Sequence, residues 1–229
     1  MTDLFPTTHA TWLMQTIVDD PPAARAHVMQ RYFDPLCAYT RASALRSLGE
    51  PAEIVNDFLA SRLASDAYLS RWPDSGLPLR RWLANGLFIH ARNTALAAKR
   101  RADLAPRAEG VDVASIARVR ASDHETDALL ALERAWAVRT VTEAHEQVRT
   151  ELHAEGRSAW WELFRLHTVQ GMAYAQAAPA VGVPLSSASS IHRQVVDRLR
   201  AALRAILERD GVRSEDIDRE LALMQDALG

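Results

Sequence analysis

The stretch from Trp160 to Leu203 constrains the fold of this chain more than any other. An apolar helical run ends at Gly171, a short alanine-rich run (MAYAQAAPA) and a turn (VGVP) follow, and a long arginine-rich amphipathic run begins at Ser186. Two helices joined by a short glycine-containing turn predict a helix-turn-helix, whose second helix is suited to the DNA major groove. An ordinary packed helical hairpin gives the same pattern, so both interpretations stay open.

The remainder of the chain also has a helical pattern. Alanine, leucine, arginine and glutamate dominate, and no segment alternates with the period of two that a strand needs. We therefore expect an all-α protein. The other expected helices span residues 8–18, 23–48 with an interruption near Pro35, 52–63, 79–101, 127–154 and 214–228, the last of them capped by Ser214, and residues 70–78 form an irregular loop.

Residues 102–126 lose the apolar period, contain Pro106 and Gly110, and become acidic. This change predicts two small helical domains, at residues 1–103 and 127–209, joined by a linker at 104–126. An acidic C-terminal helix within residues 210–229 follows the second domain. Six acids and two arginines in that last stretch set its charge apart from the helix before it.

Composition excludes several classes of protein. Apolar residues make up 48% of the chain, but no apolar run approaches the roughly 20 residues of a membrane helix. With no basic region near its start, the chain has no recognisable signal peptide, and we expect a cytoplasmic protein without membrane insertion. Cys37 is the single cysteine, so we expect no internal disulfide and no multi-cysteine metal site. We also expect no other metal site and no cofactor.

The net charge of −2 conceals two basic regions. Residues 80–107 hold seven basic side chains against one acid, and residues 193–209 hold five against two. All but Lys99 of these cations are arginines, whose guanidinium groups suit bidentate contacts to phosphate or guanine. Such a distribution favours nucleic-acid binding more than the net charge suggests.

Four segments in order resemble bacterial extracytoplasmic-function sigma factors of RNA polymerase. RYFDPLCAYTR (31–41) is similar to that family's opening helix, and AEIVNDF (52–58) to its motif for the β′ clamp helices. PLRRWLANGLFIHARNTALAAKRR (78–101) resembles the helix associated with the −10 promoter element. GMAYAQAAPAVGVPLSSASSIHRQVVDRLRAAL (171–203) is similar to the segment that binds the −35 element.

The resemblance implies a transcription initiation factor, not an enzyme. Its expected partners are core RNA polymerase, through the β′ clamp helices and the β flap, and promoter DNA. It also allows an anti-sigma factor or another regulatory partner. The acidic C-terminal helix, by hypothesis, covers a basic surface and lowers DNA affinity.

Residue by residue, the resemblance assigns Glu53, Asn56 and Asp57 to the polymerase. Alternatively, these three polar residues simply form the solvent-exposed face of a surface helix. The set implied for −10 DNA is Trp72, Arg80, Arg81, Asn93, Lys99, Arg100 and Arg101, with the cations on phosphates and Trp72 stacked on an unpaired base; a solvated helix face and a core tryptophan are the alternatives. The set implied for −35 DNA is Ser186, Ser187, Ser189, Ser190, His192 and Arg193, for which a plain N-terminal capping turn is the alternative.

Three departures from the family pattern bear on these roles. Ile54 replaces the acid of the clamp motif, and Asn56 replaces a longer glutamine. Pro179 lies within the first helix of the helix-turn-helix, where an interior proline costs about 3 kcal/mol. This helix is therefore expected to be kinked or short.

Two rival functions differ in class. A stand-alone helix-turn-helix regulator, or a degenerate sigma-like protein that binds another protein, would act without core polymerase. An enzyme has little support, because the chain lacks a phosphate-binding glycine loop, GxSxG and HExxH. Surface positions explain His124, His145, His153 and His167 better than metal ligation does.

Overall fold

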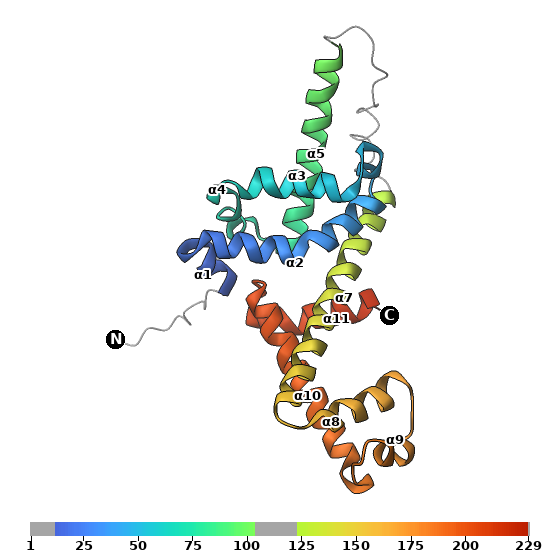
Figure 1. Ribbon diagram of the computed structural model, residues 1–229. Helices are drawn as coiled ribbons and strands as arrows, with labels where there is room; N and C mark the ends of the chain where they lie inside the picture. Colours follow the sequence, from blue (N-terminus) through green and yellow to red (C-terminus); the bar gives the residue numbers. More distant parts are fainter. Residues whose placement is uncertain (1–11, 104–122, 229) are drawn as a thin grey trace, which may run out of the picture. The chain divides into compact units, whose positions relative to one another are not determined.

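The computed structural model describes residues 12–103 and 123–228 (Figure 1). Every regular element in these two ranges is a helix, so the predicted all-α class is confirmed. None of the described helices combines the length and apolar character that crossing a bilayer requires. The expected start of the first helix at residue 8 and most of the expected linker, residues 104–122, lie outside the described residues.

The chain divides into two compact units, at boundaries other than those expected from the sequence. Unit 1 comprises residues 1–137 and 208–229, and unit 2 comprises residues 138–207. The C-terminal segment, Asp210–Leu228, therefore belongs with the N-terminal half of the chain. The predicted second domain, 127–209, is shared between the units at both of its ends.

Unit 1 begins with α1 (Trp12–Asp19), α2 (Pro21–Ala42), the 3₁₀ turn η1 (Ala44–Leu48) and α3 (Pro51–Leu63). A short α4 (Asp66–Leu69) and the 3₁₀ turn η2 (Pro73–Ser75) lead into α5 (Leu79–Asp103). Helices α2, α3 and α5 pack on one another, and α1 packs on α2. Their buried side chains include Leu36, Tyr39, Phe58, Leu83 and Leu87.

Local sequence explains where α2 starts, but not that it continues past Pro35. The Asp20 side chain accepts a hydrogen bond from the Ala23 amide, and prolines occupy the first two helical positions, where no amide is needed. The helix was expected to be interrupted at Pro35, and this is wrong, because α2 continues to Ala42. Tyr32, Leu36 and Tyr39 are buried around the proline, so packing on both sides of it holds the helix together.

Helix α7 (Asp123–Ala154) starts in unit 1 and ends in unit 2, as its residues up to Ala137 belong to the first unit. It begins four residues before the predicted start at residue 127. The end of the chain consists of the 3₁₀ turn η4 (Ser214–Asp216) and α11 (Ile217–Leu228). Ser214 does not cap α11 as expected; its hydroxyl lies 3.4 Å from Oε1 of Glu208.

Unit 2 contains the end of α7, α8 (Ser158–Phe164), the π-helical turn η3 (Arg165–Val169), α9 (Tyr174–Ala180) and α10 (Leu185–Arg209) up to Leu207. One buried cluster joins α7, α8 and α10 through residues such as Val148, Phe164 and Val195. A second cluster joins α8, α9 and the start of α10 through Leu163, Ala177, Ala178, Ala188 and Ile191. The second cluster holds α9 against the start of α10.

The predicted helix-turn-helix corresponds to α9 and α10. Gly182 lies in the turn between them with φ of 71°, a left-handed conformation that glycine adopts without steric cost. The Val183 amide donates to the Ala178 carbonyl at 2.9 Å, which ties the turn to the end of α9. Helix α9 is only seven residues long and contains Pro179 in its last turn, so it is short, as expected.

Candidate nucleic-acid interface

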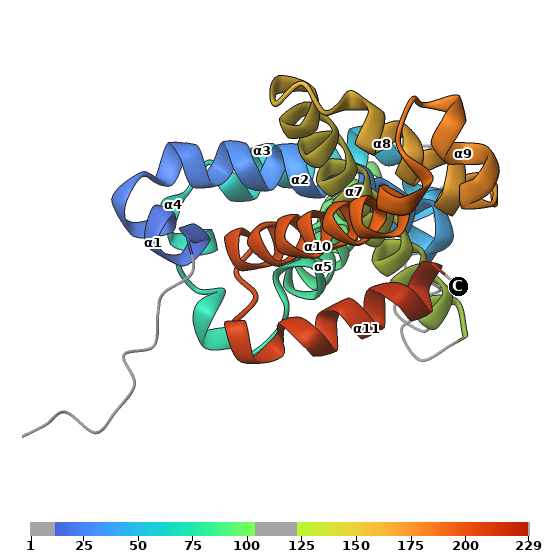
Figure 2. The ribbon, with the colours of Figure 1, turned by 90° about the horizontal axis from the view of Figure 1, so that it is seen from below.

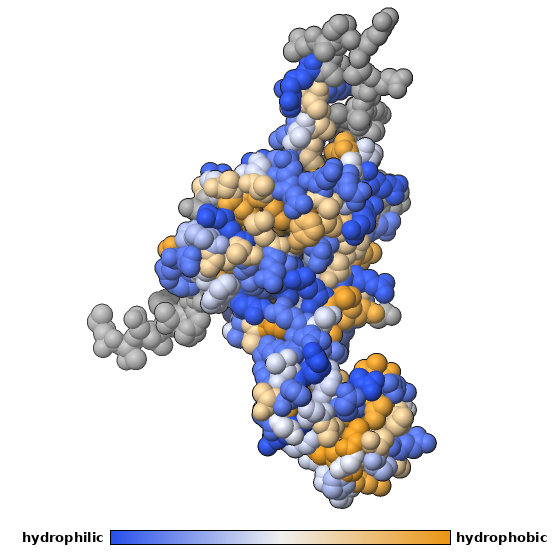
Figure 3. Space-filling model, in the orientation of Figure 1, coloured by the Kyte–Doolittle hydropathy of each residue, from blue (hydrophilic) through white to orange (hydrophobic). Residues whose placement is uncertain are grey.

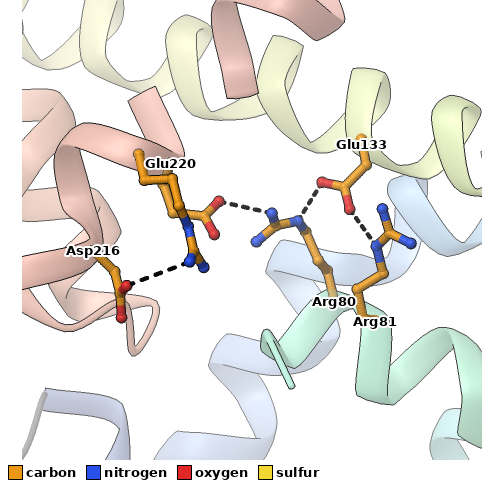
Figure 4. Close-up of polar contacts among 6 residues, drawn as sticks. Arg80, Arg81, Glu133, Asp216 and Glu220 are labelled. Atoms are coloured by element: carbon orange, nitrogen blue, oxygen red, sulfur yellow. Dashed lines mark hydrogen bonds and ion pairs between the residues drawn. The ribbon is translucent and has the colours of Figure 1, made fainter. Parts of the chain in front are cut away.

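Arg80, at the start of α5, lies in a buried network of charges (Figure 4). Its Nε donates to Glu133 of α7, and its Nη2 donates to Oε2 of Glu220 in α11 at 2.7 Å. The guanidinium also lies 4.1 Å from the ring centre of Trp136. Burial alone would lower the pKa of Arg80, but the two carboxylates more than offset it and raise that pKa, so the side chain stays charged.

Arg81 shares a carboxylate with this network but is half exposed. Its Nε donates to Oε1 of Glu133 at 2.6 Å, on the oxygen that Arg80 leaves free. Glu133 thus bridges two consecutive arginines of α5. One face of Arg81 remains open to solvent and to a ligand.

Trp72, in the loop before α5, is buried as well. Its indole Nε1 donates to the Leu77 carbonyl at 2.8 Å within the same loop, so its polar atom is already used. Its ring packs against the backbone of Gly211, where a Cβ atom would overlap the ring. Figure 2 shows the segment that leads into α11 beside this loop.

Trp72 and Arg80 therefore do not lie on an open DNA-binding surface, contrary to what the resemblance implies for them. The physical reason is the packing of the C-terminal segment and of α7 on the loop and on the start of α5. The other predicted members of the set, Asn93, Lys99, Arg100 and Arg101, are exposed. They lie on the second half of α5, which projects beyond α2 and α3 (Figure 1).

A cavity of about 310 Å³ lies beside the buried network. Trp72, Arg80, Trp136, Gly211 and Glu220 line it, together with residues of η2 and η4. All of these residues belong to unit 1. The C-terminal segment thus packs incompletely on the loop that precedes α5.

The polymerase-contact residues predicted on α3 are all exposed. Glu53, Asn56 and Asp57 point away from the buried residues Val55, Phe58 and Leu59. Oδ2 of Asp57 lies 2.7 Å from Nε2 of His90 on α5, so this carboxylate is held in place while 64% of the side chain stays exposed. This face offers polar groups to a partner without disturbing the core.

Most of the predicted −35 contacts lie at the exposed start of α10. Ser186, Ser189, Ser190 and Arg193 are exposed, and Ser187 is half-buried. The hydroxyls supply donors and acceptors, and Arg193 supplies a cation in the third turn of the helix. On the face drawn in Figure 3, apolar side chains also gather on unit 2, and Val169 and Leu185 of that unit are 67% and 57% exposed.

His192 differs from the rest of that set, since its ring packs against α8 and η3, which precede the helix-turn-helix. Its ring stacks on the Phe164 ring, with 5.7 Å between the ring centres, and its centre lies 5.0 Å from that of the His167 ring. Nε2 of His192 is 2.9 Å from Oγ1 of Thr168. Burial, and then the neighbouring His167, lower the pKa of His192, which favours a neutral ring over a phosphate contact.

The buried acids and one buried arginine are not among the residues predicted from the sequence. Arg31 of α2 donates through Nε to Oδ2 of Asp210 at 2.6 Å, and Nε2 of His27 lies 3.0 Å from Oδ1. Arg31 falls on the same helix face as the buried Ala24 and Val28, so the helical period could have indicated a buried charge. No local sequence signal identifies Glu133 and Glu220 as the carboxylate partners of Arg80.

Within residues 12–103 and 123–228, no three His, Cys, Asp or Glu side chains gather as metal ligands would. Comparisons of the chain with protein-family models, curated proteins and solved structures gave no match. The chemistry available on the described surface is that of cations for phosphate, hydroxyls for phosphate or base edges, and carboxylates for a basic partner.

Proposed function

We propose that this protein is a transcription initiation factor, which binds core RNA polymerase and directs it to promoters. In this proposal α3 contacts the polymerase through Glu53, Asn56 and Asp57. The exposed end of α5 binds the −10 region through Lys99, Arg100 and Arg101, and the start of α10 binds the −35 duplex.

The observation that carries the proposal is the order of three exposed surfaces along one all-α chain. A polar α3 comes first, an α5 that ends in three consecutive exposed cations follows, and the helix-turn-helix of α9 and α10 comes last. This is the order in which the sequence resembles the sigma factors. Phosphate contacts by the cations would supply affinity without sequence specificity.

Reconstitution with purified core polymerase tests the proposal. The full chain is expected to co-purify with core enzyme and to support run-off transcription from a genomic promoter library. Replacing Glu53 and Asn56 with alanine should weaken the complex with core enzyme without changing the melting temperature, because both side chains are exposed. Absence of both core binding and initiation would refute the proposal.

Replacing Lys99, Arg100 and Arg101 together with alanine tests the DNA surface. For single-stranded DNA, log affinity falls as log salt concentration rises, and loss of three phosphate contacts should make this slope shallower by about 2. The matched control is Arg149→Ala, which removes an exposed arginine of unit 2 that pairs with Glu146. An unchanged salt slope in the triple variant would place the DNA contacts elsewhere.

A second candidate is a helix-turn-helix regulator that acts without core polymerase. The burial of Trp72 and Arg80 favours it, because two of the groups needed at a melted −10 element are covered. Such a regulator would bind duplex DNA through α10 alone. Duplex binding without any affinity for core enzyme would select this candidate.

A further inference from the structure

We propose that the C-terminal segment, Asp210–Leu228, is an autoinhibitory element that competes with nucleic acid for the start of α5 and the loop before it. The inference rests on the proposed function, whose −10 surface it regulates. It explains why two predicted DNA contacts are covered in a chain whose other −10 cations are exposed.

The C-terminal segment touches the two members of the predicted −10 set that are buried. Glu220 contacts Arg80, and Gly211 contacts Trp72. Among the described contacts, none joins Arg81, Lys99, Arg100 or Arg101 to the C-terminal segment. The C-terminal segment therefore covers Trp72, which would stack on a base, and Arg80, which would bind a phosphate.

Glu220 places an anionic oxygen 2.7 Å from Nη2 of Arg80, with both side chains at most 5% exposed. A phosphate oxygen would bind the same nitrogen with the same geometry, because both anions accept a charge-assisted hydrogen bond from guanidinium. The Glu220 carboxylate and a phosphate cannot occupy this position beside Nη2 at the same time. Glu133 keeps the Nε side of Arg80 in either state, so release of Glu220 frees one edge of a guanidinium that is already positioned.

The C-terminal segment is attached to the rest of unit 1 at two places, firmly at Asp210 and less firmly through α11. Asp210, at its start, is buried against Arg31 and His27 of α2. Beyond Gly211, the buried side chains of α11 are Ile217, Glu220 and Met224. The cavity of about 310 Å³ between η2, η4 and α5 leaves this second attachment loosely packed. The segment can thus open from Gly211 onward while Asp210 stays in place.

Two full-length variants test the proposal at two different contacts of the C-terminal segment. Glu220→Ala removes the competing carboxylate, and Gly211→Ala adds a Cβ that would overlap the Trp72 ring at a residue with φ of 93°. The matched control is Asp226→Asn, which removes an exposed acid from the same helix. Hydrogen exchange of the amides of residues 217–228 reports whether the segment has opened.

The readout is the affinity for a fluorescent oligodeoxythymidine of about 20 nucleotides, measured by anisotropy at about 0.1 M salt. If the open form makes up about a tenth of the wild-type protein, both variants should bind about ten-fold more tightly, with faster exchange in α11. Asp226→Asn should match the wild type in both measurements. If Glu220→Ala proves unstable because Arg80 loses a counter-ion, Gly211→Ala decides alone, since it keeps every charge.

The proposal is overturned by unchanged DNA affinity in a variant whose α11 amides exchange faster. It is also overturned if neither variant changes that exchange, because the two contacts would then not hold the segment. Binding of all four proteins to core polymerase is measured in parallel. Failure of that binding refutes the proposed function, whereas equal affinity of open and closed forms for DNA refutes only the autoinhibition.

Discussion

The two units place polar groups in their interiors in different ways. Unit 1 buries full charges and pairs each with a partner: Arg80 with Glu133 and Glu220, and Arg31 with Asp210. Unit 2 instead packs the half-buried rings of His145 and His192 among aromatic side chains. Its ion pairs, such as Glu155 with Arg198, lie on the surface.

The difference shows what each kind of interior requires. The partners of Arg80 are 53 and 140 residues away in the sequence, so unit 1 is complete only when its C-terminal segment is in place. Unit 2 is formed by one continuous stretch, residues 138–207. Stability of the two units should therefore respond differently to charge removal and to pH.

Arg80→Ala should have the largest effect. It leaves Glu220 buried without its counter-ion, which costs about 3 to 5 kcal/mol in the free energy of unfolding. Urea denaturation followed by circular dichroism measures this loss. The double variant Arg80→Met with Glu220→Leu replaces the pair by apolar groups and should recover most of it. A loss below about 1 kcal/mol for Arg80→Ala would contradict a buried, paired guanidinium.

Acidification should weaken unit 2 selectively. Burial lowers the pKa of both His145 and His192 from their ordinary value of 6.5, so the unfolded chain binds protons that the folded unit resists. The stability that these rings contribute is complete above pH 6.5 and is lost as the pH falls below it. Hydrogen exchange of α8 and α10, corrected for intrinsic rates, measures the effect.

Phenylalanine at both positions 145 and 192 provides the control, because it keeps an aromatic ring and removes the titration. The pH dependence of exchange in α8 and α10 should then flatten. Unit 1 amides in α2 and α3 provide an internal reference within the same sample. Constant exchange in α8 and α10 between about pH 7 and 5.5 would mean that folding does not lower the pKa of these histidines.

Asp57→Asn should have a small effect on stability. The Asp57 side chain is 64% exposed, and an exposed ion pair contributes about 0 to 1 kcal/mol. The melting temperature should therefore stay close to that of the wild type, in contrast to Arg80→Ala. A loss of stability as large as that of Arg80→Ala would contradict this, because the exposed pair of Asp57 would then contribute as much as the buried pair of Arg80.

The smallest effect is expected at Glu155. Its hydrogen bonds from Arg198, at 2.6 and 2.9 Å, hold the pKa of this exposed carboxyl below its ordinary value. The pair thus favours folding above the ordinary pKa of glutamate, and this contribution is lost as the pH falls through the lowered value. An NMR titration of the Glu155 carboxyl should show the lowered pKa, and Arg198→Ala should return it toward its ordinary range.

The sequence predicted the helices well, because their signals are local. Asp20 and the prolines after it mark the start of α2, and Gly182 marks the turn between α9 and α10. The interruption predicted at Pro35 is wrong, because a proline signals a break locally, whereas the surrounding buried side chains keep α2 intact. Packing, which joins distant residues, overrides such a local signal.

The candidate site was predictable only in part, for the same reason. Lys99, Arg100 and Arg101 follow one another on an exposed helix end, and sequence indicates a cationic surface there correctly. Arg80 has an equally basic neighbourhood, but its burial depends on Glu220, far along the chain. A cluster of arginines in a sequence thus does not establish a positive surface. The carboxylates that reach it must also be known.

The contact between Gly211 and Trp72 limits which residues these two positions can hold together. A side chain at 211 needs the room that the indole ring occupies, and the left-handed backbone there disfavours most residues in any case. Redesign of the tail is therefore inseparable from redesign of the loop at 72. A chain with a larger residue at 211 is expected to have a smaller one than tryptophan at 72.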